Sequence, residues 1–166
     1  MKSGIMTIYN GMPKLLKSIE EFPKHDVLIG IPEDKSLRDY DADENEPITN
    51  AAIGYIAEFG APERNIPQRA WLIPSIKKAK VQISSYMKQA GAAILAGDYK
   101  KCDRAMHAAG LAGQNSARKM INTGPFQELA EATLAARLRR GRTGTKPLID
   151  TGQFRNSVTY VVRNGK

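Results

Sequence analysis

AAIGYIAEFGAPERNIPQRAWLIP, residues 51–74, predicts a short apolar helix, a stiff loop and the start of a long helix. Apolar residues recur at helical spacing up to Phe59. Thr49 or Asn50 is placed to cap the first turn of this helix. Gly60 follows the last periodic residue, as expected for a glycine that ends a helix.

The loop that follows is predicted to hold a fixed shape. Pro62 and Pro67 fix φ and reduce the conformational entropy that is lost when the loop orders. Pro74 suits the first turn of the next helix. Trp71, the only tryptophan, lies close to Arg69. Two interpretations of Trp71 stay open: it anchors a functional loop, or it is simply a core residue.

The rest of the chain predicts an α+β fold. Residues 26–32 and 157–163 read as a buried strand and a β-branched strand that pair with each other. Apolar residues at helical spacing predict helices over 12–22, 74–96, 99–122 and 126–138. The helix over 99–122 has small side chains on a face from Tyr99 through Met106 to Met120, so it should pack closely on the preceding helix or on a neighbouring subunit. The prediction is a small antiparallel or mixed β-sheet packed against long α-helices.

Length and composition indicate one domain over residues 1–166. The chain is 42% apolar and 25% charged, which is ordinary for a globular protein. No apolar run approaches the ~20 residues of a membrane span, and the N-terminus has no hydrophobic region typical of a signal peptide. We therefore expect the protein to be made in a cytoplasm and to act there or inside an assembly built there.

The net charge of +8 is carried by the C-terminal part of the chain. Residues 1–96 hold 12 Lys/Arg and 12 Asp/Glu, whereas residues 97–166 hold 13 and 5. An acidic loop is predicted over 33–47 and a flexible, exposed basic loop over 137–147. This asymmetry suggests a basic surface that faces a polyanion or an acidic partner.

Two segments carry a resemblance to a known family. The first combines YIAEFG (55–60) with IPQRAWLIP (66–74), and the second is PLIDTGQFRNSVTYVV (147–162). Together they resemble the tail-completion or minor tail proteins of long-tailed bacteriophages, related to the Mu-like virion morphogenesis group. The chain departs from the usual pattern at Ala70 and Trp71, where proline and phenylalanine are typical, and at Phe154 and Val158, where leucine and isoleucine are typical.

The resemblance implies a virion subunit of the neck, assembled as a homo-oligomeric, hexameric ring in the phage particle. Its expected partners are the head connector or adaptor and the tail terminator or tail tube. Under this hypothesis the first segment supplies a subunit or partner interface, with candidate residues Glu58, Phe59, Ile66, Pro67, Arg69 and Trp71. Acidic and basic loops on one chain suit a head-to-tail ring, because each subunit presents a different face to each neighbour.

The cluster of basic residues at the end of the predicted helix 126–138 leaves two interpretations open. Its members are Arg137, Arg139, Arg140, Arg142 and Lys146. They could contact phosphates or acidic loops of a neighbour, which makes a non-specific DNA-binding protein the alternative function. They could equally be the solvated end of a helix, where arginines suit the negative end of the dipole.

The residues that could support catalysis or a cofactor are few, so we expect no enzyme, no cofactor and no metal site. Cys102 and His107 are five residues apart on a predicted helix and point in different directions. Asp39, Asp41 and Asp43 alternate as in a calcium loop, but the glycine and final acidic positions of that motif do not match. Asp150 or Thr151 is expected to cap a helical turn.

Overall fold

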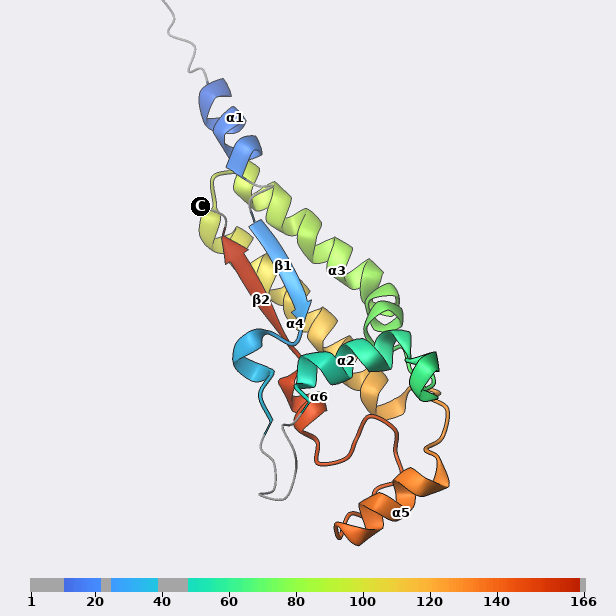
Figure 1. Ribbon diagram of the computed structural model, residues 1–166. Coiled ribbons are helices and arrows are strands. Elements are labelled where there is room, and N and C mark those ends of the chain that lie inside the picture. The colour runs from blue at the N-terminus through green and yellow to red at the C-terminus, as the bar shows by residue number, and fades with distance from the viewer. Residues whose placement is uncertain (1–10, 22–24, 39–47, 165–166) are drawn as a thin grey trace, which may run out of the picture.

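The structure is a computed structural model that describes residues 11–21, 25–38 and 48–164. Most of the predicted acidic loop, and the calcium-like Asp39, Asp41 and Asp43, lie outside the described residues. The elements are α1 (Met12–Glu21), β1 (His25–Gly30), the 3-10 turn η2 (Glu33–Lys35), α2 (Asn50–Phe59), the 3-10 turn η3 (Pro62–Arg64), α3 (Leu72–Leu95), α4 (Tyr99–Thr123), α5 (Glu131–Arg139), α6 (Gln153–Ser157) and β2 (Thr159–Asn164) (Figure 1). The predicted α+β fold is confirmed.

A long antiparallel helical hairpin, α3 and α4, forms the frame of the molecule (Figure 1). Gly97 turns the chain between the two helices with a φ of 77°, a conformation that glycine adopts without strain. Asp98 then caps α4, because its side chain accepts a hydrogen bond of 2.9 Å from the Lys101 N–H.

The two predicted strands form an antiparallel pair that lies on α4. Val27 is opposite Val162 and Ile29 is opposite Tyr160. The small residues of α4 allow this close approach, since a Cβ on Gly110 would overlap the ring of Tyr160. The small face of α4 therefore packs on α3, the preceding helix, which is one of the two predicted alternatives. It also packs on the sheet.

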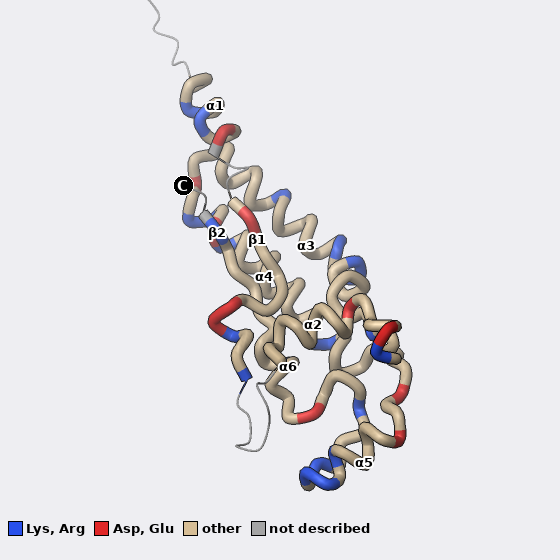
Figure 2. Tube along the Cα trace, viewed as in Figure 1, with Lys and Arg blue, Asp and Glu red and all other residues tan. Residues whose placement is uncertain are grey.

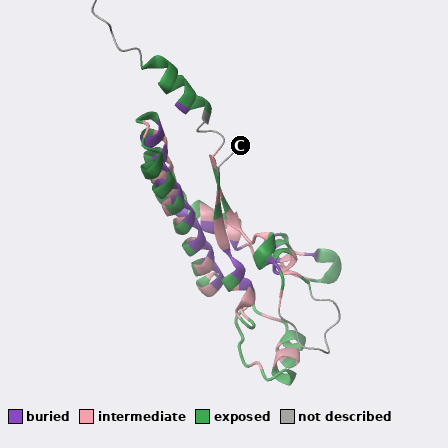
Figure 3. Ribbon diagram, turned by 90° about the vertical axis from the view of Figure 1, so that its left-hand side faces the viewer, coloured by how far each residue is buried: buried purple, intermediate pink, exposed green. Residues whose placement is uncertain are grey.

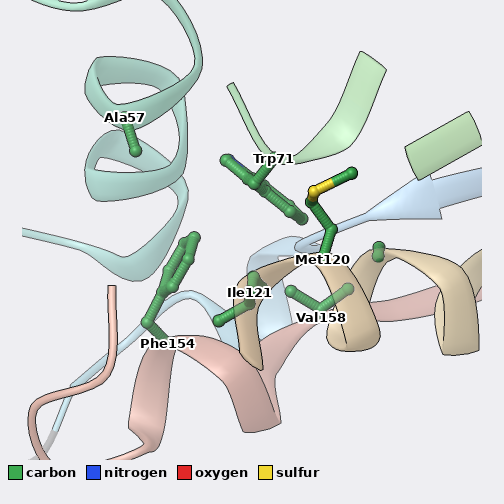
Figure 4. Close-up of a cluster of buried hydrophobic side chains, with 7 residues drawn as sticks. Ala57, Trp71, Met120, Ile121, Phe154 and Val158 are labelled. Carbon is green, nitrogen blue, oxygen red and sulfur yellow. The ribbon is translucent and has the colours of Figure 1, made fainter. Parts of the chain in front are cut away.

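Buried apolar residues gather in two clusters, one toward each end of the hairpin. The cluster at the α3–α4 turn consists of Ala90, Ala93, Ile94, Cys102, Ala105 and Met106. The other lies where α2, α6 and the start of α3 meet the end of α4, and consists of Ala57, Trp71, Ala117, Met120, Ile121, Phe154 and Val158 (Figure 4).

Two local predictions are wrong, and a third, that Asp150 or Thr151 caps a helical turn, holds only for Thr151. Tyr99 is half exposed, although the rest of the predicted α4 face is buried. The helix predicted from Phe126 begins only at Glu131, because Phe126 packs back on the core and the chain stays extended behind it. Asp150 does not cap a helical turn. It binds two arginines instead, and only the Thr151 hydroxyl accepts a bond, of 3.4 Å, from the α6 backbone.

Candidate assembly surface

The two segments that carry the family resemblance meet in one core. Trp71 from the first segment and Phe154 from the second pack edge to face, with ring centroids 5.2 Å apart and planes at 79° (Figure 4). The indole Nε1–H donates a 2.9 Å hydrogen bond to the Gly54 carbonyl. A Cβ at position 54 would lie 3.2–3.3 Å from Trp71, Phe154 and Ile31, so glycine there lets these three side chains pack closely on α2. Because Trp71 is only 3% exposed, the structure favours the interpretation of this residue as core.

Glu58 holds the start of α3. The residue is 5% exposed, and its carboxylate accepts backbone N–H bonds from Trp71 (2.8 Å), Leu72 (2.7 Å) and Ile73 (3.0 Å). The first backbone N–H groups of a helix have no partner within the helix. The next residue is Pro74, which has no N–H, so Glu58 satisfies every such donor from Trp71 to Pro74. The negative charge also suits the positive end of the helix dipole.

The loop between α2 and α3 is braced along its length. Ala61 and Ile66 form an isolated antiparallel bridge, and Asn65 adopts a left-handed conformation with φ of 54°. The Gln68 side-chain amide donates a 2.8 Å bond to the Glu58 carbonyl, and the Arg69 N–H donates to Ala57. Hydrogen bonds to backbone groups thus restrain this loop, in addition to the prolines.

Arg69 ties this loop to the segment before α5. Its guanidinium donates 3.0 Å bonds to the carbonyls of Gln127 and Glu128. A helix starting at Phe126 would have used those carbonyls itself, which explains why α5 starts late. Burial, and then the positive charge of Arg137, lower the pKa of Arg69, which stays protonated because arginine titrates far above neutral pH.

An apolar groove of about 240 Å³ opens beside the Trp71 core. It is lined by Gly30, Ile31, Ala51, Gly54, Tyr55, Glu58, Phe59, Trp71, Leu72 and Ile73. Tyr55 is 68% and Phe59 54% exposed, and their rings lie in contact with centroids 4.9 Å apart. Ile73 adds a third exposed apolar side chain at the start of α3. We call this feature the Trp71 groove.

The six candidate interface residues differ in how far they are exposed. Phe59 is exposed on the groove, whereas Glu58 and Trp71 are buried under it. Ile66, Pro67 and Arg69 are half-buried in the loop and brace it. Sequence reasoning missed Tyr55 and Ile73 as surface residues, although the four-residue spacing of Tyr55 and Phe59 on one helix face was a signal for the ring pair.

The predicted basic loop is held by its own arginines. The Arg137 guanidinium donates bonds of 2.8–3.0 Å to the carbonyls of Gly144, Lys146 and Ile149. Arg142 pairs with the Asp150 carboxylate at 2.7 Å. The Lys146 ammonium reaches the Asn122 carbonyl at 3.4 Å.

Arg137, Arg142 and Lys146 thus all bond within the chain. Arg139 and Arg140 are exposed where α5 ends, and Figure 2 shows Lys and Arg gathered there. This end of α5 is the part of the basic cluster best placed to contact a polyanion.

Potentially reactive groups are separated from one another. His107 hydrogen-bonds the Tyr160 hydroxyl at 3.2 Å, while Cys102 is buried in the cluster at the α3–α4 turn. Burial, and then the charge of Asp103, raise the pKa of the Cys102 thiol, so it stays protonated and weakly nucleophilic. Among the described residues no three His, Cys, Asp or Glu side chains gather as metal ligands would. Nor is any helix in the described part of the chain long and apolar enough to cross a membrane.

Comparisons with known protein families, curated proteins and solved structures find no match to this chain.

Proposed function

We propose that this protein is a non-enzymatic structural subunit of the neck of a long-tailed bacteriophage. In this proposal copies of the chain assemble into a ring of six in the virion, between the head connector and the tail tube or tail terminator. The observation that carries the proposal is that the two family-like segments, about 80 residues apart in sequence, share one core at Trp71 and Phe154. A shared core is what a common scaffold for both segments requires.

The exposed apolar surface supports an assembly role. Tyr55, Phe59 and Ile73 surround the Trp71 groove, and contiguous exposed apolar side chains mark interaction sites. A second exposed apolar surface lies on α1, at the other end of α3 (Figure 1). Different apolar surfaces at two ends of a subunit suit a head-to-tail contact, which closes into a ring when the rotation between subunits allows it.

The direct test is to make phage particles without this protein and to examine them by electron microscopy. The proposal predicts DNA-filled heads without tails beside free tails, and recovery when the protein is supplied in trans. Normal, infectious particles made in its absence would contradict the proposal.

Non-specific DNA binding is the second candidate, favoured by Arg139 and Arg140 on the exposed end of α5. Binding should weaken steeply with salt, as counterions are released from the phosphates. Arg139→Glu with Arg140→Glu should abolish retention of duplex DNA at low salt, whereas Lys100→Glu with Lys101→Glu, an exposed pair on α4, should weaken it far less. Equal retention by the two double variants would rule out this surface as the DNA contact.

A further inference from the structure

Helix α1 has an exposed apolar stripe. Met12, Leu15, Leu16 and Ile19 follow the i, i+3, i+4, i+7 spacing of one helix face and are each 38–55% exposed. The residue that α1 buries is the polar Ser18, whose hydroxyl bonds back to the Lys14 carbonyl. Figure 3 shows α1 exposed along most of its length. An amphipathic helix that leaves its apolar face in water has the form of a ligand for an apolar groove.

The stripe and the Trp71 groove belong to opposite ends of α3. Helix α1 lies at the C-terminal end of α3, where the Lys14 side chain packs near Gly97 (Figure 1). The groove is lined by Leu72 and Ile73, the first residues of α3. A helix of 24 residues is about 36 Å long, so the two surfaces of one chain do not meet as the chain is folded.

The charges beside the two surfaces are complementary. Along α1, beside the apolar stripe, the exposed charges are two lysines and then an acid: Lys14, Lys17 and Glu20. Beyond Ile31, which lines the groove, they are two acids and then a lysine: Glu33, Asp34 and Lys35. A helix seated in the groove could bring these opposite charges together at the rim, where they favour the correct partner and orientation more than they add affinity.

We infer that the α1 stripe of one copy docks in the Trp71 groove of a second copy. This inference rests on the proposed ring and specifies its subunit contact. Each subunit donates α1 to one neighbour and accepts α1 from the other, so both exposed apolar surfaces are buried by one repeated, head-to-tail contact. Ten residues of helix make a small interface, and closure of the ring compensates because every subunit is then held at two sites.

The first test compares self-association of the full chain with that of Leu16→Glu and Phe59→Glu. Both side chains are more than half exposed, so the variants should keep the wild-type circular dichroism spectrum and the fluorescence of Trp71. Each variant should associate at least about tenfold more weakly in sedimentation equilibrium, because a buried leucine-sized side chain is replaced by a charge. The control Val81→Glu, on an exposed part of α3 outside the groove, should associate like the wild type.

The second test identifies the contact itself. Two single-cysteine proteins, Leu16→Cys and Phe59→Cys, each also carrying Cys102→Ser, are mixed and oxidised with copper phenanthroline. A disulfide between the two proteins can form only between different copies. We expect several-fold more of this mixed dimer than when Leu16→Cys is paired with Val81→Cys in the same background.

The outcomes separate this contact from the ring. An oligomeric wild type whose mass is unchanged by Leu16→Glu, with no excess of the mixed dimer, overturns the docking of α1 and leaves the ring standing. A third protein, with Leu16→Cys, Phe59→Cys and Cys102→Ser in one chain, is oxidised alongside the two single-cysteine proteins. A disulfide that forms only within this chain shows that α1 folds onto its own groove, and also overturns the inference. A wild type that is monomeric at every concentration and is absent from virions overturns both proposals.

Discussion

Removal of the Glu58 carboxylate should destabilise the start of α3 beneath the Trp71 groove. Glu58→Ala deletes three hydrogen bonds of 2.7–3.0 Å from a charged acceptor to the backbone of Trp71, Leu72 and Ile73. Each such bond contributes ~1.5–3 kcal/mol. Their loss is not additive, because water can enter the space and solvate some of the donors. We therefore expect a loss of about 3–5 kcal/mol, which is less than the sum of three such bonds.

Glu58→Gln should have an intermediate effect. The amide keeps the shape of the side chain and one oxygen that accepts hydrogen bonds, but its NH₂ group would face a backbone N–H and cannot accept from it. We expect a loss of about 1–3 kcal/mol. Glu63→Ala, an exposed carboxylate in η3, is the matched control and should change stability by less than about 0.5 kcal/mol.

The assay is urea unfolding followed by fluorescence of the only tryptophan, at one protein concentration for all variants. Trp71 is buried directly beside the altered carboxylate, so its emission reports the loss of this core. Equal stability of Glu58→Ala and Glu63→Ala would refute the capping role. So would a greater loss for Glu58→Gln than for Glu58→Ala, because hydrogen-bond loss would then not explain the order.

Three further predictions concern the rest of the fold. Arg137→Met should release the carbonyls that accept hydrogen bonds from Arg137 and destabilise the loop by about 1 kcal/mol or more. Trypsin should then cleave residues 140–146 at least about fivefold faster. The control Arg139→Met should not change the rate of cleavage. Gly113→Ala should lower stability by about 1–3 kcal/mol because the added methyl group overlaps Ile29, although alanine favours helices; a higher melting temperature would contradict the packing. Cys102 should resist a thiol reagent such as Ellman's reagent at pH 8 until urea is added. The pKa of the Cys102 thiol is raised in the folded state, so the thiol in the unfolded chain loses its proton first as pH rises. The contribution of Cys102 to stability is therefore complete below the unfolded thiol pKa of ~8.5 and is lost as pH rises through the folded pKa. Cys102→Ala should flatten the loss of stability above about pH 9.

The helices and the strand pairing could be predicted because their signals are local and periodic. Thr49 caps α2 at 3.2 Å and Gly60 ends it with φ of 77°, as the sequence indicates. The pairing of these two strands was also predicted, since only two segments had strand character, and the structure places Val27 opposite Val162. The start of α5 could not be predicted, because it depends on Arg69, nearly 60 residues away, whose guanidinium occupies two carbonyls that a longer helix would need.

The roles of charged side chains were the hardest part to predict. The composition of residues 137–147 indicates a solvated basic loop, but it does not reveal that Arg137 folds back onto three carbonyls. Arg118 has no distinguishing pattern, yet it joins α4 to the start of β2 through the Val158 carbonyl at 2.8 Å. Such bonds depend on where distant backbone groups end up, which a linear pattern does not contain.

Native mass spectrometry of the purified protein would count the copies in its assembly. A closed ring should give one dominant species with the mass of six copies and few open intermediates, and this species should dissociate in Leu16→Glu. A single species with the mass of one chain, across all concentrations and at low salt, would contradict the proposed ring.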